Sequence, residues 1–134
     1  MSKRSFAMKR ILFTALVALS LFGCNKEQEN TQTNEPHLLE EKCNEGDAES
    51  CFNLGNSYYD GENIKQDYAK AVGYYQKACD GGNATGCLTL GALFYIGINV
   101  KQDYKQAKEY YGKACDLGYQ NGCEAYKELN KQGF

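Results

Sequence analysis

The sequence contains very few of the side chains from which enzyme sites are built. Its 134 residues include a single histidine, His37, and beyond the first 23 residues the only serines are Ser50 and Ser57. Nucleophilic catalysis requires a nucleophile beside a base, and neither serine has a lysine three positions later. There is no Cys-x-x-Cys pair and no histidine among the cysteines, which argues against redox catalysis and against a zinc site. We therefore predict no catalytic residue, no metal ligand and no cofactor.

The sequence also lacks an apolar run long enough to span a bilayer as a helix. The longest such run, residues 11–22, is about half the length that a transmembrane helix needs. It follows basic residues at positions 3, 4, 9 and 10, an arrangement typical of an export signal. The protein could start at Met1 or at Met8, because the residues after Met8 already make a complete signal.

The end of this apolar run resembles the cleavage box of bacterial lipoproteins. Leu21-Phe22-Gly23-Cys24 places a cysteine where such proteins carry lipid on the first residue of the mature chain, although Phe22 is bulkier than usual at that position. An ordinary secretory signal followed by a stray cysteine is the alternative. We predict a lipoprotein signal peptide at residues 1–23 and lipidation of Cys24, which would anchor the protein to a membrane surface without spanning it.

Removal of the signal makes the chain acidic. Residues 24–134 carry eleven lysines and seventeen acidic residues, a net charge of −6, which argues against nucleic acid or anionic lipid as the main partner. Residues 24–36 are polar and are predicted to form a disordered tether. Asn25 is not the aspartate associated with inner-membrane retention, so we expect the periplasmic face of the outer membrane, with secretion as the alternative.

Internal repetition dominates the remaining sequence. Residues 43–78 and 79–114 align without gaps and are identical at 18 of 36 positions. The cysteines recur with the same period: Cys43, Cys79 and Cys115 form one series, and Cys51, Cys87 and Cys123 form the other. The chain therefore holds two full repeats, about 43–78 and 79–114, with half a repeat at each end.

Each repeat has the periodicity of two helices. In residues 47–60, and again in 67–79, apolar side chains fall at the i, i+3, i+4, i+7 spacing of one helical stripe. Gly61 can end the first helix in a left-handed conformation, and Asp67 is a suitable N-cap for the second. Because the linker is short, the two helices must be antiparallel. The fold class is thus an all-α superhelix of αα-hairpins over residues 37–134, with half-repeat caps.

The repeated residues resemble those of the Sel-one-like repeat family. The matching pattern is Ala48…Leu54-Gly55…Tyr58-Tyr59-Asp60-Gly61, followed by Asp67-Tyr68…Lys70-Ala71…Tyr74-Tyr75-Gln76-Lys77-Ala78. This family forms superhelices related to tetratricopeptide arrays. The cysteine pairs make the chain similar to its cysteine-rich exported subgroup, the Hcp proteins. Members of that subgroup are commonly described as penicillin-binding proteins or weak β-lactamases, so the resemblance implies hydrolysis of a β-lactam amide as an alternative activity.

The cysteine spacing fits structural disulfides. If Cys24 is lipidated, six cysteines remain, an even number in an exported protein, and six cysteines allow 15 pairings. The helix placement narrows these, because the first cysteine of each pair ends one helix and the second lies in the first turns of the next. We predict the disulfides Cys43–Cys51, Cys79–Cys87 and Cys115–Cys123. Each would join the second helix of one repeat to the first helix of the next, giving three disulfide-closed hairpins.

The first helix of each repeat carries the predicted binding surface, because in superhelices of this kind that helix lines the concave groove. The predicted groove residues are Asn53, Asn56, Tyr59, Asp60, Thr89, Ala92, Tyr95 and Ile96. Four further tyrosines on the apolar stripes are predicted to be core residues: Tyr68, Tyr75, Tyr104 and Tyr111.

Two functions from different classes follow. The leading hypothesis is a monomeric, envelope-anchored or exported scaffold that binds a peptide or protein in this groove, with a cell-wall peptide or a β-lactam among the ligands considered. The alternative is the weak β-lactamase or penicillin-binding activity that the resemblance implies. A lipoprotein recognised only through its surface is a third, less specific reading.

Overall fold

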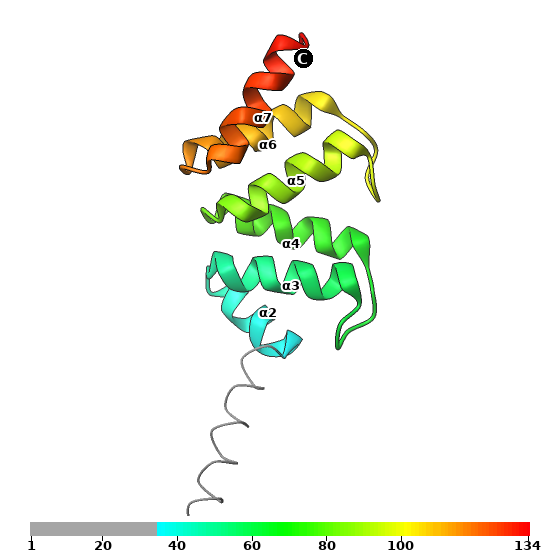
Figure 1. Ribbon diagram of the computed structural model, residues 1–134. Coiled ribbons are helices and arrows are strands. Elements are labelled where there is room, and N and C mark those ends of the chain that lie inside the picture. The colour runs from blue at the N-terminus through cyan, green and yellow to red at the C-terminus, as the bar shows by residue number, and fades with distance from the viewer. Residues whose placement is uncertain (1–34) are drawn as a thin grey trace, which may run out of the picture. The chain divides into compact units, whose positions relative to one another are not determined.

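The computed structural model describes residues 35–134, which form a stack of helices (Figure 1). The helices are α2 (Pro36–Asn44), α3 (Ala48–Asp60), α4 (Tyr68–Asp80), α5 (Ala84–Ile96), α6 (Tyr104–Asp116) and α7 (Gln120–Lys131). The predicted signal peptide, Cys24 and nearly all of the predicted tether lie outside the described residues. Within residues 35–134, none of the helices has the length and hydrophobicity needed to cross a bilayer.

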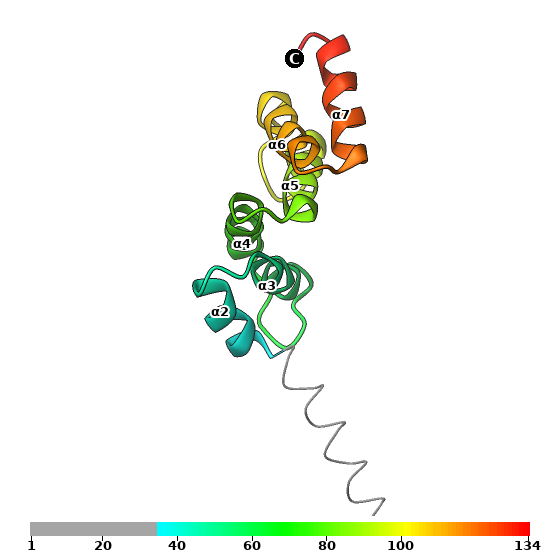
Figure 2. The same cartoon turned by 90° about the vertical axis from the view of Figure 1, so that its left-hand side faces the viewer.

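The helices follow one another along the stack, and each contacts mainly its neighbours in the sequence. Figure 2 shows α4 to one side of α3 and α5, the first helices of the two repeats, so these two helices share a face that α4 does not cover. The predicted all-α hairpin array is confirmed. Helix α2 begins at Pro36, one residue earlier than expected, because the fixed φ of proline suits the first position of a helix.

The predicted helix ends are confirmed by their capping geometry. Asp67 has an extended backbone, and its side chain accepts a hydrogen bond from the N–H of Lys70 at 3.0 Å. Asp103, one period later, caps α6 in the same way. Gly61 ends α3 with a left-handed φ of 72°, and Gly97 ends α5 with 77°. Each boundary is therefore specified locally and is repeated after 36 residues.

The core is built where a tyrosine ring of one helix lies against a glycine of the helix before it. Tyr75 of α4 is 3% exposed and covers Gly55 of α3, where a Cβ atom would stand only 2.7 Å from the ring carbons. Tyr111 and Gly91 repeat this contact between α6 and α5. The close approach buries the leucine side chains Leu54 and Leu90 almost completely. The prediction that Tyr75 and Tyr111 are core residues is thus confirmed.

The same prediction is wrong for Tyr68, which is 36% exposed. It holds in part for Tyr104, which is partly buried and packs against a core cluster. Each is the first residue of its helix, so its ring reaches only the edge of the preceding helix. There the Tyr68 ring meets Tyr59 edge-on, with centroids 5.2 Å apart. Gln66 donates hydrogen bonds to the Tyr59 carbonyl at 2.8 Å and to the Tyr68 hydroxyl at 2.9 Å, which keeps that hydroxyl at the surface.

Candidate functional site

The three predicted disulfides are present. Cys43–Cys51 joins α2 to α3, Cys79–Cys87 joins α4 to α5, and Cys115–Cys123 joins α6 to α7, with Cα–Cα distances of 4.6, 4.6 and 4.5 Å. Each spans a turn whose glycine has a positive φ: Gly46, Gly82 and Gly118. The described part of the chain therefore consists of three covalently closed hairpins, as the helix placement predicted.

The three disulfides differ in burial. The sulfurs of the first two pairs lie in the core; Cys79 is 4% exposed and Cys87 is fully covered. Cys115 and Cys123 are only partly buried, because α7 is the last described helix and leaves one side of the final hairpin uncovered. The cysteines of the third disulfide are therefore the most exposed of the three pairs.

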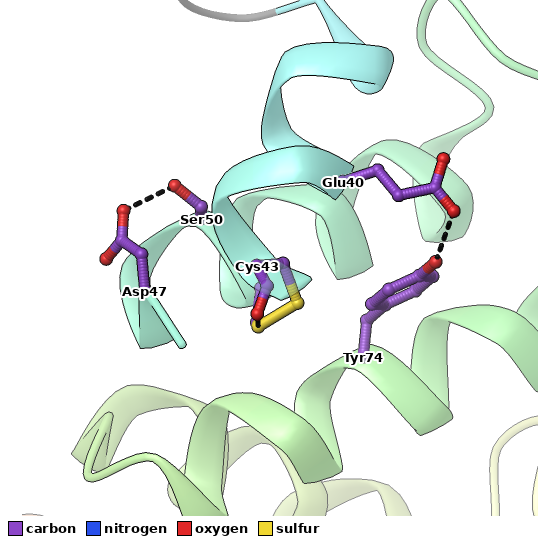
Figure 3. Close-up of a disulfide and its surroundings, with 6 residues drawn as sticks. Glu40, Cys43, Asp47, Ser50 and Tyr74 are labelled. Carbon is purple, nitrogen blue, oxygen red and sulfur yellow. Dashed lines mark hydrogen bonds between the residues drawn. A yellow bond between two sulfur atoms is a disulfide. The ribbon is translucent and has the colours of Figure 1, made fainter. Parts of the chain in front are cut away.

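Polar side chains surround the first disulfide in two local pairs (Figure 3). The Ser50 hydroxyl donates to Asp47 Oδ2 at 2.6 Å, and this hydrogen bond lowers the pKa of the Asp47 carboxyl. The Tyr74 hydroxyl of α4 donates to Glu40 Oε1 of α2 at 3.3 Å. Burial, together with the nearby Glu40 charge, raises the pKa of Tyr74. The Tyr74–Glu40 pair thus joins α4 to α2, whereas the Ser50–Asp47 pair lies within the start of α3.

The few side chains that could serve as a nucleophile or a base are separated or engaged in local contacts. Ser50 is held by Asp47, whose lowered pKa makes it a weaker base at neutral pH. The Ser57 hydroxyl donates to the Asn53 carbonyl one turn earlier in the same helix, at 3.2 Å. His37 is exposed near the start of α2, while Ser57 lies in the last turn of α3. Among residues 35–134 no cluster of His, Cys, Asp and Glu could hold a metal ion.

The eight predicted groove residues lie at equivalent positions of α3 and α5, and none of them is buried. Three of them are partly occupied by contacts within the fold. The Asn56 side-chain oxygen accepts a hydrogen bond from the Tyr75 hydroxyl at 2.8 Å. The Tyr59 ring packs against Tyr68, and Tyr95 meets Tyr104 in the same way at 5.5 Å. The five others form the accessible part of the face, here called the α3–α5 face: Asn53, Asp60, Thr89, Ala92 and Ile96.

The chemistry of this face changes from one repeat to the next. Asp60 at the end of α3 corresponds to Ile96 at the end of α5, and Glu62 in the first linker corresponds to Ile98 in the second. Both isoleucines are exposed, Ile96 by 58% and Ile98 by 46%. Our sequence reasoning missed Ile98, although the exchange of an acidic for an apolar residue between aligned repeats was the signal for it.

Two cavities lie away from this face. One, of about 570 Å³, is formed by α6 and α7, and another, of about 320 Å³, lies beside the Cys43–Cys51 disulfide. None of the eight predicted residues lines either cavity. The prediction of a binding groove at these residues therefore stays a prediction about an accessible surface.

Comparison with known proteins agrees with the repeat. The family model described as Sel1 repeat matches residues 48–83 and 85–119. A Sel1 repeat protein from Oxalobacter formigenes has 22% identity and a TM-score of 0.67 over 72% of each chain, which supports the fold. Helicobacter pylori cysteine rich protein B has 38% identity and a TM-score of 0.65, over 77% of this chain and 80% of that one.

A third similar structure is a protective antigen of uropathogenic Escherichia coli with an SLR fold. It has 26% identity and a TM-score of 0.65, and the match covers 74% of this chain but only 21% of the antigen. No curated protein sequence matches the chain.

Proposed function

The chain belongs to the Sel1 repeat family, and from that premise we propose that it is an exported scaffold that holds an extended peptide segment of a partner protein on the α3–α5 face. The supporting observation is the row of accessible side chains at equivalent positions of two parallel helices. A surface for a peptide needs accessible groups that the fold does not already use. Ile96 is exposed, and Asn53 and Thr89 are partly exposed.

The composition of the row limits the kind of peptide. The α3 half presents amide and carboxylate groups, and Asp60 and Glu62 make its end acidic. The α5 half presents Ala92 and the exposed Ile96. A segment with a basic residue near α3 and an apolar residue near α5 complements both halves in charge and in hydrophobicity. Such a segment would need only an extended backbone and two anchor side chains.

A selection from a random peptide library on the oxidised protein tests this proposal. Binders should be enriched in sequences that place Lys or Arg a few residues from Leu, Ile or Phe. Ile96→Asp restores the residue of the first repeat, so it suits the fold, and it should weaken a selected peptide about tenfold by removing apolar contact. Asn63→Gly in the linker is the matched control, since Asn63 already has a positive φ of 58°, and it should change nothing. Equal affinity for Ile96→Asp and wild type would exclude the α3–α5 face.

Export is the second part of the proposal, and the cysteines support it. All six cysteines of the described residues are paired in disulfides, and a disulfide-rich fold similar to the cysteine rich protein of Helicobacter pylori is consistent with an oxidising location outside the cytoplasm. We further propose anchoring through lipid on Cys24 at the outer membrane. Metabolic labelling with an acyl-chain analogue should mark the wild type and not Cys24→Ser; equal labelling of the two would contradict it.

The alternative activity is hydrolysis of a β-lactam amide. A chromogenic cephalosporin assay distinguishes it from peptide binding alone. The engaged hydroxyls of Ser50 and Ser57 lead us to expect turnover at background level. Turnover well above background that follows the protein through purification, and that survives full oxidation, would overturn the view of the chain as a binding scaffold alone.

A further inference from the structure

The cavity between α6 and α7 differs in character from the acidic chain around it. Its volume of about 570 Å³ is within the range of sites for small organic ligands. The aromatic residues Tyr126 and Phe134 line it together with Gly112, and so do three lysines, Lys105, Lys108 and Lys113. Glu109 and Asp116 also line it. The lining side chains therefore carry a net positive charge.

The cavity depends on residues that depart from the repeat. Gly112 stands where the first repeat has Gln76, and Lys105 and Lys108 replace Ala69 and Val72. Gly112 matters for the space, because even a Cβ atom there would lie 3.2 Å from the Tyr126 ring. Tyr126 itself occupies the position that is leucine, Leu54 and Leu90, in the two repeats. Half of the aligned positions are unchanged between the repeats, yet these changes fall together at one place.

Two of the lysines lack a carboxylate side chain as partner among residues 35–134. Lys113 is compensated, because its Nζ lies 3.6 Å from Glu109 and 4.0 Å from Asp80. Lys105 and Lys108 form no salt bridge with any side chain of residues 35–134. The Lys108 ammonium lies 5.5 Å from the centroid of the Tyr126 ring and donates a hydrogen bond to the Phe134 carbonyl, so it is already directed at an oxygen acceptor beside the rings.

We propose that this cavity binds a small organic anion that carries an aromatic ring or a short apolar chain, such as an aryl carboxylate. The apolar group would lie against Tyr126 and Phe134 above Gly112. The carboxylate would face Lys105 and Lys108, neither of which pairs with a carboxylate side chain of the described residues. This site shares no residue with the α3–α5 face and is independent of the peptide-binding proposal.

An NMR titration of the isotope-labelled, oxidised protein with 3-phenylpropionate tests the proposal, with 3-phenylpropanol as the uncharged analogue. The acid should shift the amide signals of Lys108, Gly112 and Tyr126 and should bind more tightly than the alcohol. Gly112→Gln restores the residue of the first repeat and should abolish these shifts. Lys108→Val, also the residue of the first repeat, should weaken binding about two- to fivefold, as expected for loss of an exposed charge contact. Lys101→Ala, in the linker before α6, is the control of equal charge change and should leave the affinity unchanged.

Three outcomes would overturn the proposal. The alcohol could bind as tightly as the acid, the shifts could lie outside α6 and α7, or the Lys101→Ala and Lys108→Val proteins could lose affinity equally. If Gly112→Gln proved unfolded by circular dichroism, Lys108→Val against Lys101→Ala would still decide between specific recognition and general attraction to positive charge.

Discussion

Removal of the disulfides one pair at a time should separate two contributions of a disulfide to stability. One is the lowered entropy of the unfolded chain, and the other is the packing of the sulfur atoms in the core. The informative comparison is Cys79→Ala with Cys87→Ala against Cys115→Ala with Cys123→Ala. The two pairs have the same sequence separation, 8, so they restrict the unfolded chain equally. They differ in burial, because the first pair lies in the core and the second is partly exposed.

The magnitudes follow from loop closure and from packing. A ring of this separation contributes about 2.5 kcal/mol through the lowered entropy of the unfolded chain. Both double variants should therefore lose about 2–3 kcal/mol of unfolding free energy. Loss of the two buried sulfur atoms of Cys79 and Cys87 should leave a small cavity that costs about 1 kcal/mol more. The central pair should thus be the more damaging one to remove.

Urea unfolding of the oxidised proteins, followed by far-ultraviolet circular dichroism, measures both quantities. The variant lacking the exposed disulfide serves as the internal control for chain entropy. Equal losses in the two variants would refute the burial argument. A loss well below about 1 kcal/mol in both would refute the claim that the disulfides stabilise this short array.

Two further predictions concern the tyrosines of the core. Gly91→Ala would place a Cβ atom 2.6 Å from the Tyr111 ring and should destabilise the fold by about 1–3 kcal/mol. Gly73→Ala, where a Cβ atom would have no neighbour within 4 Å, should stabilise α4 by about 0.5–1 kcal/mol. Urea unfolding measures both changes, and equal effects of the two variants would contradict the packing account. Burial, with a smaller effect of the Asp60 charge, raises the pKa of Tyr75 to about 12 from an ordinary value of 10.0. The neutral phenol is therefore favoured in the fold, so its contribution to stability should be complete below pH 10.0 and should be lost as the pH rises to about 12. Tyr75→Phe should remove this part of the pH dependence, and an unchanged pH profile would show that other groups cause it.

The fold was predictable because each local signal occurs more than once. Asp67 and Asp103 cap equivalent helices, and each cysteine pair recurs after 36 residues, so an error in one copy would have been exposed by the next. Periodicity failed only at the helix starts. It assigns Tyr68 to the apolar stripe, but it does not show that the ring of a residue in the first turn reaches only the edge of the neighbouring helix and stays exposed.

The candidate sites were harder to predict, for different reasons. The positions of the α3–α5 face follow from helical periodicity, but whether a surface is hollow depends on how successive hairpins are rotated, which no local pattern encodes. The α6–α7 cavity rests on Gly112, whose effect depends on the ring of Tyr126 in the next helix. The change from Gln76 to Gly112 is visible in the sequence, but only the packing of α7 shows that it leaves a space.

The most direct test of the peptide scaffold is a map of where a selected peptide binds. Titration of the isotope-labelled, oxidised protein should move the amide signals of the α3–α5 face, with the largest changes at Asp60, Thr89 and Ile96. Helices α4 and α6 should change little. Changes confined to α4 and α6, with the α3–α5 face unaffected at saturation, would contradict the account.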